Sequence, residues 1–197
     1  LFERAEAMLR EILEYDPAHL YTLISLGQLH LSLGRIDEAM DLFLRARSLD
    51  PIDSTVASSV YMALQVRGLY RQALAEADRM EELHPNAYKP HLWRAVVSFL
   101  TGNYRNSVEQ FQTAFATPQG EPFAIHFAPF YLGALARAGD QDSALRQLQL
   151  VRSHAEAGRT SLNHLAMAYC GISDMESCRL WLNRSLERRE QSFLTMR

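Results

Sequence analysis

Apolar and small residues along this chain recur at steps of three and four positions, without the strict alternation that is typical of strands. This spacing places the residues on one face of an α-helix. A second run with the same spacing follows the first after a short gap, so the pattern predicts two successive amphipathic helices. The first run contains Leu23, Leu26, Gly27 and His30, and the second contains Ile36, Ala39, Phe43 and Ala46.

The same two-helix pattern returns along the sequence with a period of 34 residues. Glycines mark the period at Gly34, Gly68 and Gly102, and Gly139 follows after 37 residues. Ser173 stands 34 residues after Gly139. A regular period of this length is typical of a helical repeat protein. Prolines recur with the same period, at Pro17, Pro51 and Pro85.

Each marker of the repeat has a physical reason. Glycine adopts the left-handed backbone that a tight turn between helices requires. Proline cannot continue a helix, so it ends the second helix of each unit. A small residue stands five positions after each of the four glycines and after Ser173, where two antiparallel helices come closest. These small residues are Ala39, Ala73, Ser107, Ala144 and Cys178.

The chain resembles the tetratricopeptide repeat (TPR) family in its period, its small positions and its proline stops. The unit from 20 to 53 carries the motif residues Leu26, Gly27, Gly34, Ala39, Phe43, Ala46 and Pro51. The resemblance implies an all-α, right-handed superhelical solenoid of antiparallel helix hairpins that forms one array over residues 1–197. It divides into a half repeat at 1–17 and repeats at 20–53, 54–87, 88–121, 125–158 and 159–192.

The register gains three residues between the third and fourth repeats, in a stretch that contains Pro118, Gly120 and Pro122. Pro129 falls within the first helix of the fourth repeat. Because proline lacks the donor that a helix interior needs, we expect that helix to start late or to bend at this residue.

The resemblance implies that the first helix of each repeat lines a concave surface. Part of each first helix packs inward against its neighbours. The remaining face of these helices carries a largely apolar stripe. The alternative for Leu31, Phe99 and Cys170 is that they pack between repeats. The candidate partner-binding residues are Tyr21, Ile24, Gln28, Ser58, Met62, Gln65, Lys89, Leu92, Val96, Phe99, His126, Phe130, Asn163 and Met167.

An apolar stripe of this kind favours a hydrophobic peptide or an amphipathic helix as the partner. One branch of the TPR family grips a terminal carboxylate with several lysines, arginines and asparagines. Here Lys89 is the only lysine or arginine on the stripe and Asn163 is its only asparagine, and they lie two repeats apart. The chain therefore does not fit that branch. We therefore predict an adaptor, scaffold or regulatory module whose partner is a protein segment, including another domain of the same protein. Self-association through the array is a further possibility.

The last two repeats resemble the arrays of bacterial winged-helix regulators and adenylate cyclases. The resemblance lies in the stretches from Ala134 to Asp140 and from Asp174 to Leu182, and in the charged end after Leu186. It implies an alternative function, the ligand-sensing regulatory domain of a bacterial signalling protein. That alternative requires a closed pocket near Trp93, His126 and Phe130.

Composition narrows the function classes. The net charge of −3 over 197 residues argues against a nucleic-acid surface, and no apolar run reaches the roughly 20 residues of a membrane span. The seven histidines show no i, i+4 pair typical of a helical metal site. The sequence has no phosphate loop or nucleophile elbow, so we expect neither an enzyme nor a cofactor.

Two features of individual residues complete the expectations. Asp140 and Asp142 lie in a turn before a helix, where the simplest role for either is to cap the helix. Cys170 and Cys178 are too few for a disulfide framework. We interpret them as buried thiols, which suits a reducing compartment and a cytoplasmic location.

Overall fold

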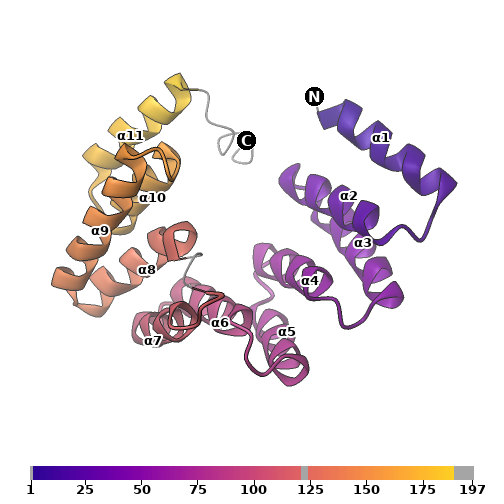
Figure 1. Cartoon of the computed structure of the whole chain (residues 1–197), viewed down its shortest axis with the longest axis horizontal. Helices are drawn as coiled ribbons and strands as arrows, with labels where there is room; N and C mark the ends of the chain where they lie inside the picture. The colour runs from indigo at the N-terminus through magenta and orange to yellow at the C-terminus, as the bar shows by residue number, and fades with distance from the viewer. Residues whose placement is uncertain (1, 121–123, 189–197) are drawn as a thin grey trace. The chain divides into compact units, whose positions relative to one another are not determined.

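The structure is a computed structural model that describes residues 2–120 and 124–188. Those residues form eleven α-helices and no strand (Figure 1). The helices are α1 (Phe2–Tyr15), α2 (Leu20–Ser32), α3 (Ile36–Leu49), α4 (Ser54–Val66), α5 (Tyr70–Leu83), α6 (Lys89–Leu100), α7 (Tyr104–Phe115), α8 (Ala124–Ala138), α9 (Gln141–Glu156), α10 (Leu162–Gly171) and α11 (Met175–Glu187). The all-α helical-repeat fold predicted from the sequence is confirmed.

The chain divides into two compact units, residues 1–86 with α1–α5 and residues 87–197 with α6–α11. In the first unit each helix contacts the next, and α2 also contacts α4. In the second unit each helix again contacts the next, and α8 contacts both α6 and α10. First helices thus pack on first helices of the neighbouring repeat within each unit. The division falls beside the predicted boundary between the second and third repeats.

The predicted glycine turns are present in the structure. The four period-marking glycines have positive φ angles of 77°, 73°, 82° and 94° at Gly34, Gly68, Gly102 and Gly139. Ser173 takes the same place in the fifth repeat, with φ of 66°. It is the one residue other than glycine with positive φ in the part of the chain that the structure describes. The turn is therefore a property of the repeat position and persists without glycine.

The small positions lie where the helices of a hairpin meet. Ala39, Ala73 and Ser107 are fully buried, and Ala144 and Cys178 nearly so. The Ser107 hydroxyl is satisfied because it donates a hydrogen bond to the Ala95 carbonyl at 2.8 Å. At another close position, a Cβ added to Gly27 would collide with the Phe43 ring. Close approach of the two helices therefore fixes the residue size at these positions.

Helix ends also follow the sequence signals. α1, α3 and α5 each end two residues before a proline. Asp53 accepts hydrogen bonds from the backbone N–H groups of Thr55 and Val56 at the start of α4. Asp140 accepts one from the N–H of Ser143 at the start of α9 at 3.0 Å, so its predicted capping role is confirmed.

Two details of local structure differ from expectation. The helix that contains Pro129 begins at Ala124 and runs through the proline, so of the two expected outcomes, a late start or a bend, the late start is wrong. Cys170 and Cys178 form a disulfide between α10 and α11 and are not free thiols. Disulfides are typical of oxidising compartments, so the cysteines give no support to a reducing one.

Some sequence predictions fall outside what the structure describes. Pro122 and residues 189–192 of the fifth predicted repeat lie outside the described residues. No helix among the residues described is both long and apolar enough to cross a membrane.

Candidate functional site

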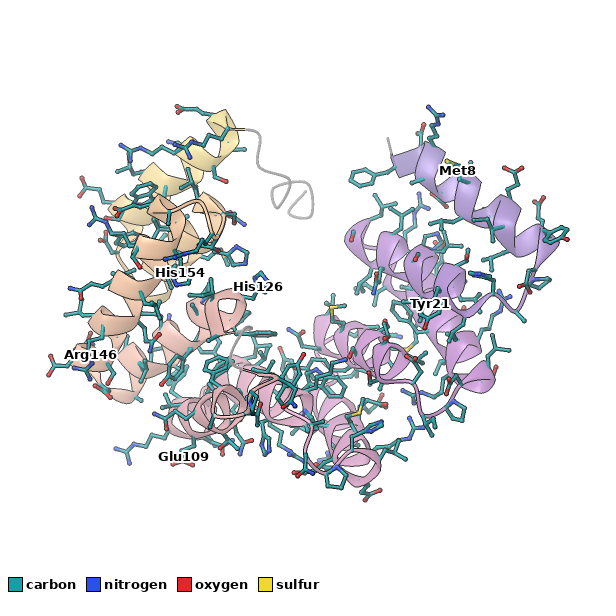
Figure 2. All side chains as sticks on the ribbon, viewed as in Figure 1. Met8, Tyr21, Glu109, His126, Arg146 and His154 are labelled. Carbon is teal, nitrogen blue, oxygen red and sulfur yellow. A yellow bond between two sulfur atoms is a disulfide. The ribbon has the colours of Figure 1, made fainter. Side chains whose placement is uncertain are left out.

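The predicted partner-binding stripe of the first unit is carried by α2 and α4. Tyr21 stands at the start of α2 with 63% of its surface exposed (Figure 2). Met62 on α4 is 38% exposed, and Gln28 is also exposed. Ser58 and Gln65 on α4 are half-buried. The exposed members of the stripe on these two helices therefore include a large aromatic and a large aliphatic side chain, and its other members carry hydroxyl and amide groups.

The predicted stripe of the second unit is less accessible. Lys89, Phe99, Phe130 and Met167 are half-buried, and His126 at the start of α8 is exposed (Figure 2). The Phe99 ring packs edge-on against Phe130 with ring centroids 5.5 Å apart. The Arg137 guanidinium covers the same Phe99 ring, 5.5 Å from its centroid. Phe99 and Phe130 therefore hold α6 and α8 together.

Four of the predicted contact residues are buried and offer almost no surface to a partner. These are Ile24, Leu92, Val96 and Asn163. Ile24 belongs to the core cluster that joins α2, α3 and α4. Spacing alone had placed them on the accessible stripe, and for these four that placement is wrong.

The residues expected around a closed sensory pocket do not line either of the two cavities described below. Trp93 is buried in α6. His126 lies beside His164 of α10, with ring centroids 5.4 Å apart. No group of three or more His, Cys, Asp or Glu side chains in the described parts of the chain is placed to hold a metal ion.

A pocket that the sequence did not reveal lies in the first unit, between α3, α4 and α5. Its volume is about 450 Å³, and arginines stand around an apolar wall. Arg79 lines this pocket, and an arginine stands at the same place one period earlier, at Arg45. This recurrence was the sequence signal that could have drawn attention to this side of the unit. The lining residues are Met40, Leu44, Arg47, Val60, Leu64, Arg67, Leu69, Gln72, Ala75, Glu76 and Arg79.

A second cavity of about 450 Å³ lies in the other unit, between α9, α10 and α11. Trp181 forms part of its wall, and the Arg184 guanidinium stacks over the Trp181 ring at 4.7 Å from the centroid. This stacking already engages the Trp181 ring and the Arg184 guanidinium. The cavity therefore offers a ligand fewer side chains without a partner than the pocket of the first unit does.

A buried charge cluster joins α1 to the first repeat. The Glu6 carboxylate accepts hydrogen bonds from Arg35 at 2.9 and 3.1 Å and pairs with Arg10 on its own helix. His30 is buried, with its Nε2 3.2 Å from Glu6 and its Nδ1 3.2 Å from Glu38. Burial opposes the charge on Glu6, but Arg10, Arg35 and His30 outweigh burial and lower its pKa.

Known proteins share this architecture. Residues 2–59 match the tetratricopeptide repeat family. A TPR protein from Parabacteroides merdae aligns over 100% of this chain and 78% of its own, with 14% identity and a TM-score of 0.74. TTC0263, a thermophilic TPR protein in Thermus thermophilus, covers 87% of this chain and 90% of its own, with 19% identity and a TM-score of 0.69. The family match is limited to residues 2–59, and the solved structures show that the chain shares their helical-repeat fold.

Two further comparisons complete the picture. YrrB, a TPR protein with an unusual peptide-binding site, covers 95% of each chain with 16% identity and a TM-score of 0.53. No curated protein sequence matches the chain. Structural likeness at these identities establishes the fold alone, so residue roles in this chain rest on its own geometry.

The two candidate surfaces of the first unit belong to different helices. The stripe of Tyr21, Gln28 and Met62 uses first helices, α2 and α4. The pocket of Arg47, Glu76 and Arg79 uses second helices, α3 and α5, with residues of α4 between them. The chemistry also differs, since these stripe residues carry no charge and the pocket lining carries four charged side chains.

Proposed function

We propose that this chain is a protein-binding module and that the first helices of residues 1–86 bind a peptide segment. One observation carries the proposal. Tyr21 and Met62 are large apolar side chains that stand exposed on neighbouring first helices, where a TPR array presents its stripe. Exposed aromatic and methionine side chains are typical of protein interaction surfaces.

The comparisons support the general class, a protein-binding module. The TPR match covers residues 2–59, which include α2 and the start of α4. YrrB offers a relative in fold that has a peptide-binding site. Gln28 and Ser58 supply hydrogen-bonding groups beside the apolar side chains, and such polar groups fix the register of an extended peptide.

The test uses peptides selected from a displayed random library against the full chain. The affinity of the best peptides is then measured for the wild type, Tyr21→Glu and Met62→Glu. Both exchanges place a charge in an apolar contact, so we expect at least a tenfold loss, roughly 1.4 kcal/mol. Circular dichroism confirms that each variant is folded.

Leu145→Glu is the matched control, because Leu145 is an exposed apolar residue on α9. It should leave the affinity unchanged. Peptides whose affinity is the same for the wild type and for both stripe variants would refute this surface as the binding site. A library that yields no binding peptide would refute the function itself.

A further inference from the structure

The pocket between α3, α4 and α5 combines an aliphatic wall with concentrated positive charge. The wall contains Met40, Leu44, Val60, Leu64, Leu69 and Ala75. Leu44 is 47% exposed, so part of the wall is open to solvent. A volume of about 450 Å³ is in the range of sites that hold a few side chains or a small ligand.

The charge of the pocket contrasts with that of its surroundings. Residues 1–86 contain eight arginines and fourteen acidic residues, yet three of those arginines line this one pocket. Among the lining residues Glu76 is the single carboxylate. Arg47 approaches Glu76 to 2.8 Å and Arg79 to 3.3 Å, while Arg67 pairs at 2.9 Å with the exposed Asp37. The pocket therefore keeps a positive surplus on an acidic unit.

Arg47 also holds unused hydrogen-bonding capacity. Its Nε is buried and donates no hydrogen bond to any described part of the chain. A buried donor without an acceptor is unfavourable, and a ligand oxygen that reaches this group would supply the missing acceptor. The planar guanidinium suits a carboxylate in particular, because its parallel N–H groups match the two oxygens.

We propose that this pocket is a second peptide-binding site, which takes a segment in which glutamate or aspartate alternates with large aliphatic residues. The acidic side chain meets Arg47 and Arg67, and the aliphatic side chain lies on Leu44 and Leu64. The acidic surroundings favour a ligand of few charges over a polyanion such as nucleic acid, since the fourteen acidic residues of this unit repel the latter. The site is separate from the stripe on α2 and α4 and does not depend on it.

The first experiment compares three fluorescent peptides by anisotropy with the full chain. Each peptide has a Gly-Ser background and a five-residue core, Leu-Glu-Leu-Glu-Leu, Leu-Gln-Leu-Gln-Leu or Leu-Lys-Leu-Lys-Leu. We expect the Glu peptide to bind, the Gln peptide to bind at least about tenfold more weakly, and the Lys peptide not to bind. Added salt should weaken binding of the Glu peptide because the arginines are partly exposed.

The second experiment locates the site. Arg47→Gln, Arg67→Gln and Leu44→Asp should each weaken binding of the Glu peptide, Arg47→Gln by about tenfold or more. Arg71→Gln is the matched control, since Arg71 is exposed on α5 outside the pocket. If Arg47→Gln does not fold, Arg67 and Leu44 still provide the test, because both are partly exposed.

The outcomes separate this site from the stripe. Tyr21→Glu and Met62→Glu should leave the Glu peptide bound as tightly as the wild type does. Equal affinity for all three peptides, no binding up to millimolar concentration, or an equal loss in Arg71→Gln would overturn the proposal. Loss of binding in the stripe variants alone would overturn it too, and would assign the acidic peptide to the stripe.

Discussion

Arg79 donates a hydrogen bond from its guanidinium to the backbone carbonyl of Pro51. Arg45, one repeat earlier, makes the same contact with the Pro17 carbonyl at 3.2 Å. Both arginines lie 28 residues after their proline, so each second helix binds the loop that ends the preceding second helix. The period of the sequence is thus repeated in a long-range hydrogen bond, and this bond orients successive repeats within residues 1–86.

Removal of this contact should destabilise the first unit. Arg79→Met keeps most of the aliphatic stem but loses the bond to Pro51 and the pairing with buried Glu76. We expect the free energy of unfolding to fall by about 1–2 kcal/mol. Arg45→Met loses only the bond to Pro17 and should cost about 0.5–1 kcal/mol.

Urea denaturation followed by circular dichroism measures both changes. Arg71→Met on the exposed face of α5 is the control and should stay within about 0.5 kcal/mol of the wild type. Equal stability of the Arg71 and Arg79 variants would show that the loop contact contributes nothing.

The turn residue of the fifth repeat offers a stabilising change. Ser173 holds a positive φ of 66°, a conformation that costs a residue with a Cβ roughly 1 kcal/mol. Ser173→Gly should therefore raise stability by about 0.5–1 kcal/mol. Gly139→Ser should lower it by a similar amount, and by backbone conformation alone, since a Cβ at Gly139 meets no atom within 4 Å. Thermal denaturation of the two variants should show shifts of opposite sign, and shifts of the same sign would contradict this explanation.

Much of the fold could be predicted because it depends on backbone geometry. A left-handed turn, a close helix contact and a helix stop each accept few residue types, so Gly34, Ala39 and Pro51 are visible in the sequence. The predicted start of the first full repeat, residue 20, is also the first residue of α2. Even the exception at Ser173 was placed correctly by the period.

The binding surface was harder to predict because side-chain burial depends on neighbours. Spacing placed Leu92 and Val96 on the same face as Lys89, and the structure buries the first two while Lys89 stays half-buried. The arginine pocket combines residues from three helices, and no single helix pattern displays it. The disulfide required a different step, the recognition that Cys170 and Cys178 face each other across the turn between α10 and α11.

The cluster around Glu6 should make stability depend on pH. Its pKa lies below the ordinary value of 4.5 because Arg10, Arg35 and His30 outweigh the opposing effect of burial. A lowered pKa means that the carboxylate stabilises the fold above about pH 4.5 and that this contribution is lost as the pH falls through the lower, folded-state value. Glu6→Gln should therefore be less stable than the wild type at pH 7.

Urea midpoints measured from about pH 7 to pH 3 test this linkage. The difference between the wild type and Glu6→Gln should shrink toward the acid end. Glu11→Gln, on the exposed side of the same helix, should show little difference at any pH. A Glu6→Gln difference that stays constant with pH would refute the charge-based explanation and leave only a packing effect.

The disulfide between α10 and α11 should make the last repeat sensitive to reductant. Cys170 and Cys178 are eight residues apart, and closing a loop of this size stabilises a fold by about 2–3 kcal/mol in the chain-entropy account. Dithiothreitol should therefore lower the melting temperature of the wild type, with mass spectrometry to verify reduction.

Two cysteine variants separate the covalent bond from other effects of the reductant. Cys170→Ser should melt at the temperature of the reduced wild type and should not respond to dithiothreitol, because it has no bond to lose. Cys178→Ser serves as a second variant, since serine already fills the equivalent buried position at Ser107. A reduced wild type that melts at the same temperature as the oxidised protein would show that the disulfide does not stabilise this hairpin.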